Sequence, residues 1–150
     1  MKLSTRTEID ATPDKVFGLA ADFDRLEAVA RERGATVERL DDGRNGPAAA
    51  RWRITAPIRG QVRSGEIGIT AYVPGEQIAA QGALEGLSIF GNMELVEFAA
   101  GRTRMFSTLD MKPGSLKARM LVQSLKLARG TLERRLAKRM EKFARRAETA

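Results

Sequence analysis

The sequence predicts an α+β fold, in which an antiparallel sheet of six to seven strands is covered by one long C-terminal helix. Residues 35–111 divide into strand-like segments separated by short turns that contain Gly or Pro. Residues 115–148 form the one long segment with helical periodicity. Strands joined by short turns pair antiparallel, and one apolar face of such a sheet needs a cover, which the helix is large enough to supply. We assign residues 1–150 to a single domain.

The N-terminal segment predicts one strand followed by two short helices. Residues 2–10 alternate loosely between apolar and polar side chains and are rich in Thr, which favours a strand. Thr12 is a candidate N-cap, with Pro13 at the first helical position. Asp24, with Glu27 three residues later, is the candidate cap of the second helix.

Six further strands are expected to form a meander. A turn-rich segment at 41–47 and the Pro-Gly turn at 74–76 give the clearest boundaries. The expected strands are 35–40, 49–56, 58–73, 77–84, 87–98 and 103–111. The third of these is long, and we expect it to bend or bulge at Gly60, Gly65 or Gly68.

The long helix begins after Pro113-Gly114, with Ser115 as its N-cap. Its 34 residues would span about 51 Å as one helix. The apolar stripe swings by roughly 100° beyond Gly130, so the helix bends there or its halves bury against different surfaces. A close contact at Gly130 would explain a glycine at this place. We assign the first half to the roof of a cavity and the second half to partners or surfaces.

The same segment carries the net charge of the chain. It holds eleven basic and three acidic residues, while the whole protein has a net charge of +7. Five basic residues share one direction beyond Gly130: Arg135, Lys138, Arg139, Lys142 and Arg146. A solvated face is the most frequent explanation of such a pattern, and an anionic membrane surface is the alternative. Nucleic acid is disfavoured, since Phe143 is the one aromatic residue there, and the apolar stripe beyond Gly130 offers a homodimer contact.

Composition excludes several classes of site. The chain has no Cys and no His, so it has no disulfide, no thiolate metal site and no Ser-His-Asp triad. No phosphate-binding loop or metal-like cluster of carboxylates is apparent. The N-terminus shows no apolar signal segment, and no apolar run approaches the length of a membrane span. We therefore expect a cytoplasmic protein without metal or cofactor.

Three motifs carry a resemblance to a known family. They are TEIDATPDKVFGLAADFDRLE at 7–27, YVPGEQI at 72–78 and SLKLARGTLERRLAKRMEKFARRAE at 124–148. Together they resemble the START-related (SRPBCC) superfamily, the polyketide cyclase/dehydrase and lipid-transport clan that has the helix-grip fold of the birch pollen allergen. Residues 25–29, RLEAV, depart from the usual family pattern after Asp-Phe. The resemblance implies a curved sheet and a long helix that enclose a cavity for an apolar small molecule.

The strand and helix faces that we expect to point inward supply the candidate ligand-binding residues. These are Trp52, Ile54, Ile69, Ile78, Leu87, Ile89, Met93, Met105, Leu109, Met120, Leu121 and Leu125. A filled core is the competing explanation for each of them. The leading functional hypothesis is non-enzymatic binding or transport of a lipid, isoprenoid or polyketide-like molecule. The alternative is a cyclase- or dehydratase-like enzyme, for which Glu66 and Tyr72 are the candidate proton-transfer groups.

Overall fold

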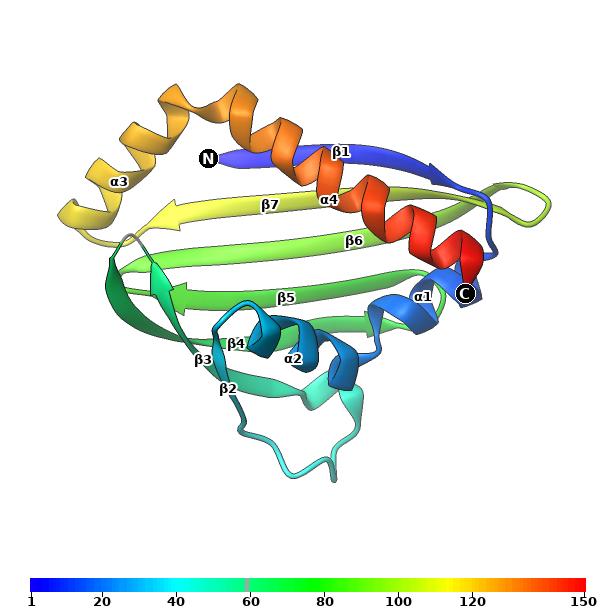
Figure 1. The fold of residues 1–150 in the computed structure, drawn as a ribbon, viewed down its shortest axis with the longest axis horizontal. Helices are drawn as coiled ribbons and strands as arrows, with labels where there is room; N and C mark the ends of the chain where they lie inside the picture. The colour runs from blue at the N-terminus through cyan, green and yellow to red at the C-terminus, as the bar shows by residue number, and fades with distance from the viewer. Residues whose placement is uncertain (59) are drawn as a thin grey trace.

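The computed structural model describes residues 1–58 and 60–150 and has the α+β helix-grip architecture that the sequence predicts (Figure 1). Seven antiparallel strands form one sheet in the order β1-β7-β6-β5-β4-β3-β2. The strands are β1 (Lys2–Ile9), β2 (Thr36–Arg39), β3 (Arg51–Ile58), β4 (Gln61–Val73), β5 (Gln77–Leu84), β6 (Leu87–Ala99) and β7 (Arg102–Pro113). The helices are α1 (Pro13–Ala20), α2 (Phe23–Glu32), α3 (Leu116–Leu127) and α4 (Arg129–Thr149), with a short 3₁₀ turn at Pro47–Ala49.

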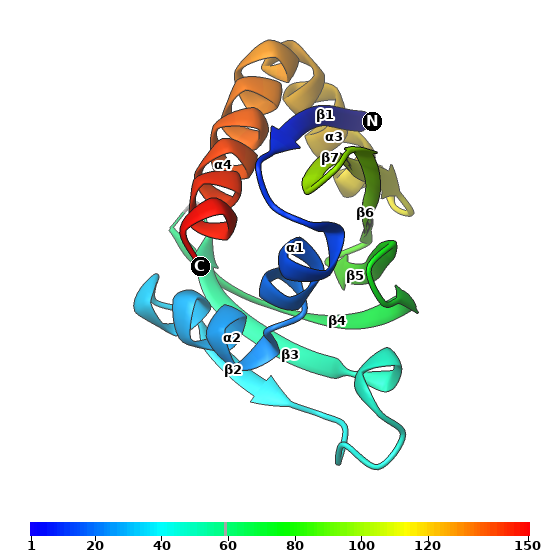
Figure 2. The same ribbon diagram turned by 90° about the vertical axis from the view of Figure 1, so that its right-hand side faces the viewer.

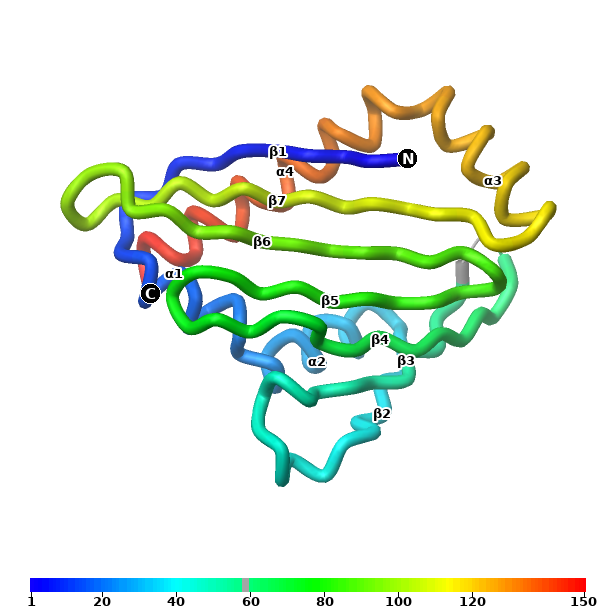
Figure 3. The backbone as a smooth tube through the Cα atoms, turned by 180° about the vertical axis from the view of Figure 1, so that it is seen from behind, coloured from blue at the N-terminus to red at the C-terminus, as the bar shows by residue number. Residues whose placement is uncertain are grey.

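All the α-helices lie on the same side of the curved sheet. Viewed along the strands, the sheet curls so that α4 faces α1 and α2 across its concave side (Figure 2). From behind, the strands β4 to β6 lie in front of the helices, so no helix covers the convex side there (Figure 3). No helix in the described part of the chain is both long enough and apolar enough to cross a membrane.

The two short helices begin with side-chain caps. The Oγ1 of Thr12 accepts a hydrogen bond from the backbone N–H of Lys15 at 3.3 Å, as the sequence predicts. The cap of the second helix lies earlier in the chain than expected. Asp22 is this cap, and its carboxylate accepts from the N–H of Arg25 at 3.2 Å. The prediction of Asp24 was wrong because Asp24 already lies in the first helical turn, where its negative charge is favourable.

The long predicted strand at 58–73 is shorter, and residue 59 lies outside the described residues. Gly60 has φ of 77° in the turn that joins β3 to β4. The bulge falls between Ile69 and Ala71, so Gly65 and Gly68 are not the bulge positions. Gly65 has another role: a Cβ there would lie 2.6 Å from the carbonyl oxygen of Ala83, so the close approach of β5 requires glycine.

The C-terminal segment is two helices rather than one. Ser115 caps α3 through an Oγ that accepts from the N–H of Ala118 at 3.1 Å. The chain leaves helical geometry at Ala128, with φ of −102° and ψ of 16°, shortly before the predicted bend. Gly130 is not at a close contact, because its hypothetical Cβ would meet only the guanidinium of Arg134. The prediction of a packing role for Gly130 was therefore wrong.

The break sends the two helices to different parts of the sheet. α3 packs against β7, whereas α4 runs along β1. The apolar stripe of α4 is used inside the molecule: Leu132 and Leu136 pack on the core beneath α3, and Ala144 and Ala147 are fully buried near α1. This stripe is therefore unavailable for the homodimer contact suggested by the sequence.

Candidate ligand-binding cavity

A cavity of about 410 Å³ lies between the concave face of the sheet and the helices α2 and α4. Every strand except β1 contributes to its walls, and α2 and α4 enclose it from two sides. The lining residues are Ala20, Phe23, Leu26, Glu27, Ala30, Val37, Trp52, Ile54, Ile67, Ile69, Ile78, Ala79, Ala80, Gly91, Asn92, Met93, Ser107, Met140 and Phe143. Glu27, Asn92 and Ser107 are the exceptions in a lining that is otherwise apolar, so the cavity suits an apolar ligand.

An aromatic pair forms one wall. The rings of Phe23 and Trp52 meet edge to face, with centroids 5.1 Å apart and an interplanar angle of 81°. Both side chains are buried, and they join α2 to β3. This contact fixes α2 on the sheet and leaves the indole ring facing the cavity.

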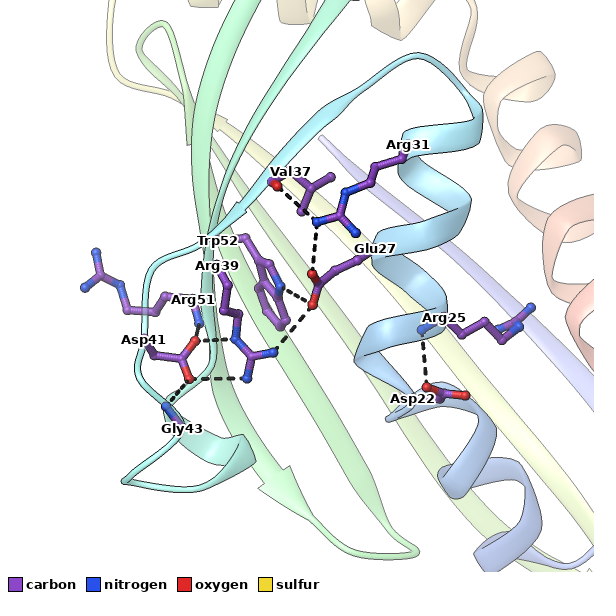
Figure 4. A network of polar contacts seen from close by, with 10 residues as sticks. All are labelled: Asp22, Arg25, Glu27, Arg31, Val37, Arg39, Asp41, Gly43, Arg51 and Trp52. Carbon is purple, nitrogen blue, oxygen red and sulfur yellow. Dashed lines mark hydrogen bonds and ion pairs between the residues drawn. The ribbon is translucent and has the colours of Figure 1, made fainter.

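Glu27 supplies the polar end of the cavity, as Figure 4 shows. Its carboxylate accepts from Trp52 Nε1 at 3.3 Å and from the guanidinium of Arg39 at 3.5 Å. The Glu27 carboxylate also accepts a hydrogen bond from Nη2 of Arg31 at 3.4 Å. The same nitrogen donates to the backbone carbonyl of Val37 at 3.2 Å. The Glu27 side chain is only 13% exposed. Its charge is therefore neutralised at the edge of the cavity.

Arg39 connects this carboxylate to the following turn. Its guanidinium lies over the Trp52 ring, 5.1 Å from the centroid, and it pairs with Asp41 through both Nε and Nη2. The hydrogen bond from Arg39 is the main cause that holds the pKa of Asp41 far below its usual range, and the backbone N–H of Arg51 contributes. The Arg39 guanidinium is thus held over the Trp52 ring by two carboxylates, those of Asp41 and Glu27.

The opposite wall is provided by α4. Met140 and Phe143 point from this helix into the cavity, about one helical turn apart. The Ser107 hydroxyl on β7 lies 3.4 Å from the Met140 Sδ, within reach of a weak hydrogen bond. These contacts place α4, not α3, over the large cavity, which corrects the assignment of the roof to the first half of the C-terminal segment. The break at Ala128 is the physical reason, because it turns α3 away toward the end of the sheet.

Five of the predicted ligand-binding residues line the large cavity: Trp52, Ile54, Ile69, Ile78 and Met93. They lie on β3, β4, β5 and β6 and share its concave face. Their alternation along each strand is the pattern from which the sequence predicts them.

The other predicted residues lie elsewhere. Leu87, Leu121 and Leu125 line a second cavity of about 260 Å³ beneath α3. Ile89 and Leu109 pack in the core under α3 and α4. Met105 is fully buried in the core beside α1, and Met120 is 66% exposed on the outer side of α3. Met120 was predicted to face inward because it belongs to the apolar stripe of the first half of the segment, but α3 buries only the side that carries Leu121.

The structure also moves the two candidate proton-transfer groups away from the large cavity. Glu66 lies on the convex side of the sheet, where its carboxylate pairs with Arg51 at 3.4 Å and Arg53 at 3.0 Å and is 48% exposed. Glu66 therefore does not reach the cavity that a proton-transfer role would require, because its side of β4 lies next to these two arginines of β3. Tyr72 stacks edge-on against Phe17, with centroids 5.1 Å apart, and does not line the cavity.

All five residues of the basic face of α4 are exposed. Within the described residues, none of the five forms a salt bridge or hydrogen bond through its side chain. The acidic residues of α4 pair instead with Arg129 and Arg145. The five cations therefore form a stripe that no carboxylate of the described chain neutralises.

Several lining residues were missed by sequence analysis. Phe23, Leu26 and Ala30 belong to α2, which the sequence shows as a short amphipathic helix without indicating where it docks. Met140 and Phe143 are visible in the sequence as part of the apolar stripe beyond Gly130, but that stripe was assigned to partners. Glycine positions such as Gly91 carry no side chain and hence no hydrophobic signal.

Comparison with known proteins extends these observations. Residues 1–148 match the family model described as polyketide cyclase / dehydrase and lipid transport. No match is found among curated protein sequences. Among solved structures, the chain is similar to the ZhuI aromatase/cyclase of Streptomyces sp. R1128, with a TM-score of 0.69, 14% identity and 99% and 93% of the two chains covered.

Two further structures show the same fold. The protein TTHA0849 from Thermus thermophilus has a TM-score of 0.66 and 18% identity over 98% of this chain and 97% of that one. A START superfamily protein from Mycobacterium smegmatis has a TM-score of 0.57 and 16% identity, with 89% and 95% of the two chains covered. At these identities the similarity establishes the fold alone.

Proposed function

The chain belongs to the polyketide cyclase/dehydrase and lipid-transport family, and from this premise we propose that it binds a hydrophobic small molecule in the large cavity. The observation that carries the proposal is the cavity itself, which is about 410 Å³ in volume and almost wholly apolar in its lining. Its volume falls within the range of about 300–1,000 Å³ that is typical of small-molecule sites.

The lining defines the chemistry of the ligand. Aliphatic and thioether side chains from β4, β5 and β6 favour a lipid, isoprenoid or polyketide-like carbon skeleton. Glu27 and the paired Trp52 indole mark one end where a hydroxyl group of the ligand would find an acceptor. The ligand that fits best is therefore a mostly apolar molecule with a single polar end.

The positions of the polar groups favour binding over catalysis. Glu66 pairs with arginines on the convex side, outside the cavity. Glu27 is held by three donors, and Ser107 contacts a thioether rather than a base. A cyclase-like reaction would need a group free to exchange a proton at the reacting atom. The binding or carrier function therefore fits this cavity better than the enzymatic alternative.

Two measurements test the binding proposal. Native mass spectrometry of the protein purified from cells should show an added mass from a retained apolar molecule. Trp52 is the sole tryptophan of the chain and lines the cavity, so its fluorescence should change on titration with fatty acids, isoprenoid alcohols or aromatic polyketides. Unchanged Trp52 emission with every one of these classes, together with an unliganded mass, would reject the proposal.

Gly91 offers a blocking variant. No heavy atom lies within 4 Å of the place where its Cβ would be, and Gly91 lines the cavity. Gly91→Leu should fill this space and reduce ligand affinity by about tenfold or more, while the added buried surface raises thermal stability. Gly18→Leu is the matched control, because Gly18 is exposed on α1 with open space around its Cβ position. The control should bind like the unmodified protein.

The unpaired cations of α4 support a second proposal, association with an anionic membrane surface. Exposed basic residues on one helical face attract anionic lipid, and each contributes about 1 kcal/mol near such a surface. Replacement of Lys138, Arg139 and Lys142 by Glu should weaken retention on anionic vesicles. Equal retention of this variant would reject the second proposal and leave the stripe as a solvated face.

A further inference from the structure

The outer face of α3 is apolar and exposed. Leu116, Met120 and Leu127 are 74%, 66% and 92% exposed, respectively. At 100° per residue their directions fall within about 40° of one another, so the three side chains form one strip along the helix. We name this strip the α3 outer strip.

Burial on the sheet does not account for this strip. α3 packs through its opposite side, where Ala118 and Val122 are 2% and 4% exposed and Leu121 and Leu125 join the same core. The helix is therefore apolar on two opposite sides, and only one of them contacts the rest of the chain. Leu127, at 92%, is among the most exposed large hydrophobic residues of the described chain.

Positive charge flanks the strip. α3 contains Lys117, Arg119 and Lys126 and no acidic residue. Within residues 1–58 and 60–150, none of these three side chains forms an ion pair. On the helical wheel Arg119 and Lys126 lie on one side of the strip and Lys117 on the other. Long basic side chains in these places can lie along an apolar surface while their charged ends reach outward.

The position of α3 leaves the strip accessible. The helix lies at one end of the long axis of the molecule, beside the end of β7 and the start of β6 (Figures 1 and 3). The start of β4 lies beside it, since Arg63 and Lys117 line the same small cavity. Val62, next to Arg63, is 77% exposed and adds a further apolar side chain at this end.

We propose that the α3 outer strip is a docking surface for an anionic phospholipid bilayer, into which Leu116, Met120 and Leu127 insert. The apolar strip supplies the contact with the acyl region, and the three flanking cations complement anionic headgroups. A second copy of the chain fits poorly, because face-to-face pairing of two α3 helices would bring the cations of both together without a carboxylate on either helix.

This docking surface is distinct from both functions proposed above. No residue of α3 lines the large cavity, so ligand binding does not depend on the strip. The basic face of α4 and the α3 outer strip are both proposed to contact an anionic membrane, but they lie on different helices. Separate variants of the two helices therefore distinguish their roles.

The test is flotation with vesicles of phosphatidylcholine alone and vesicles with about one-third phosphatidylserine. The protein should float with the anionic vesicles and be released at about 1 M salt, where the Debye length falls to about 3 Å. The variant Leu116→Gln/Met120→Gln/Leu127→Gln should lose about tenfold or more in partitioning. The variant Lys117→Gln/Arg119→Gln/Lys126→Gln should lose about 100-fold, from about fivefold per cation.

Val96→Gln is the matched control, because Val96 is 51% exposed on β6 near the turn at the far end of the sheet. This variant should float normally, and all variants should keep the far-ultraviolet circular dichroism of the unmodified protein. Insertion is measured directly with Leu127→Trp in a Trp52→Phe background, whose emission should shift to shorter wavelength with anionic vesicles.

Three outcomes would overturn the proposal. One is normal flotation of the apolar α3 variant, with loss only when Lys138, Arg139 and Lys142 are reversed. Another is an unshifted emission of the Leu127→Trp probe. The third is a dimer in sedimentation equilibrium that Leu127→Gln dissociates, which would assign the strip to a second copy. Trp52 titration with a soluble apolar ligand should be unaffected by the Gln variants of α3, because no residue of α3 lines the large cavity, so failure here is separable from failure of the cavity proposal.

Discussion

The Ser107 hydroxyl on β7 lies 3.4 Å from Met140 Sδ on α4, which joins the sheet to the helix across the edge of the large cavity. The two residues are 33 positions apart in sequence. This contact identifies the part of the C-terminal segment that encloses the cavity. It also selects Met140 as the side chain whose truncation should change cavity size with the least change to the fold.

Met140→Ala should enlarge the cavity and lower the free energy of unfolding by about 1–2 kcal/mol, less than for a fully buried methionine because Met140 is only partly buried. Affinity should shift toward bulkier apolar ligands, measured by Trp52 fluorescence titration. Met120→Ala is the control: it removes an exposed methionine, and its unfolding free energy should change by less than about 0.5 kcal/mol. Equal effects of the two variants on ligand preference would contradict the placement of Met140.

Glu27→Ala should destabilise the protein by about 1–2 kcal/mol, because it leaves the Trp52 N–H and two guanidinium groups without their shared acceptor. The emission maximum of Trp52 should change as well. Glu38→Ala removes a carboxylate that also pairs with an arginine but is 62% exposed, so its effect should stay below about 0.5 kcal/mol. Urea denaturation followed by circular dichroism compares the two variants.

The Arg39–Asp41 pair should make stability depend on acid pH. Arg39 holds the pKa of Asp41 well below its usual range in the folded protein, whereas the pKa of the same carboxyl in the unfolded chain is about 3.9. The folded state therefore binds this proton less readily, and the stabilisation is present above about pH 5 and lost as the pH falls below about 4.

Asp41→Asn should accordingly lower the melting temperature at neutral pH, and the difference from the unmodified protein should shrink toward about pH 3. Asp42→Asn is the control, because Asp42 is 62% exposed and contacts an exposed arginine. A difference between Asp41→Asn and the unmodified protein that stays constant from about pH 7 to about pH 3 would contradict the ion pair.

Gly130→Ala should raise the free energy of unfolding by about 0.5–1 kcal/mol. Gly130 lies in the first turn of α4, and the one atom near its Cβ position is the Nη1 of Arg134, at 3.4 Å on a flexible side chain. Alanine therefore gains helix propensity without a clash. Thermal denaturation measures the effect. A loss of stability would show that the break at Ala128 depends on the glycine at position 130.

Much of the fold was predictable because it depends on local rules. Turn residues at 41–47, 74–76 and 85–86 delimit the strands, and the cap residues Thr12 and Ser115 begin helices where the sequence places them. Alternation along β3 to β6 also predicts Trp52 and its aliphatic neighbours in the cavity. Successive side chains of a strand point to opposite faces of the sheet, so alternate residues are apolar wherever one face is covered.

Which helix covers which part of the sheet was not predictable in the same way. A stripe of apolar residues shows that a helix buries one side but does not show which element that side packs against. The sequence therefore shows that Met140 and Phe143 belong to such a stripe, but not that they line the cavity. Glu66 illustrates the same limit. The direction of its side chain, toward the convex side of the sheet, is established only by the pairing of β4 with β3, which places Glu66 beside Arg51 and Arg53.

Local patterns in the residues were sufficient for the α+β class, the family, most of the helix caps, the concentration of positive charge in the C-terminal segment and the apolar character of the cavity. Long-range packing was needed to establish that this segment breaks at Ala128, that α4 encloses the large cavity with α2, and that α3 leaves its outer strip exposed. The reason is physical. Periodicity fixes the directions of side chains within one element, but contacts between distant elements fix where each element lies.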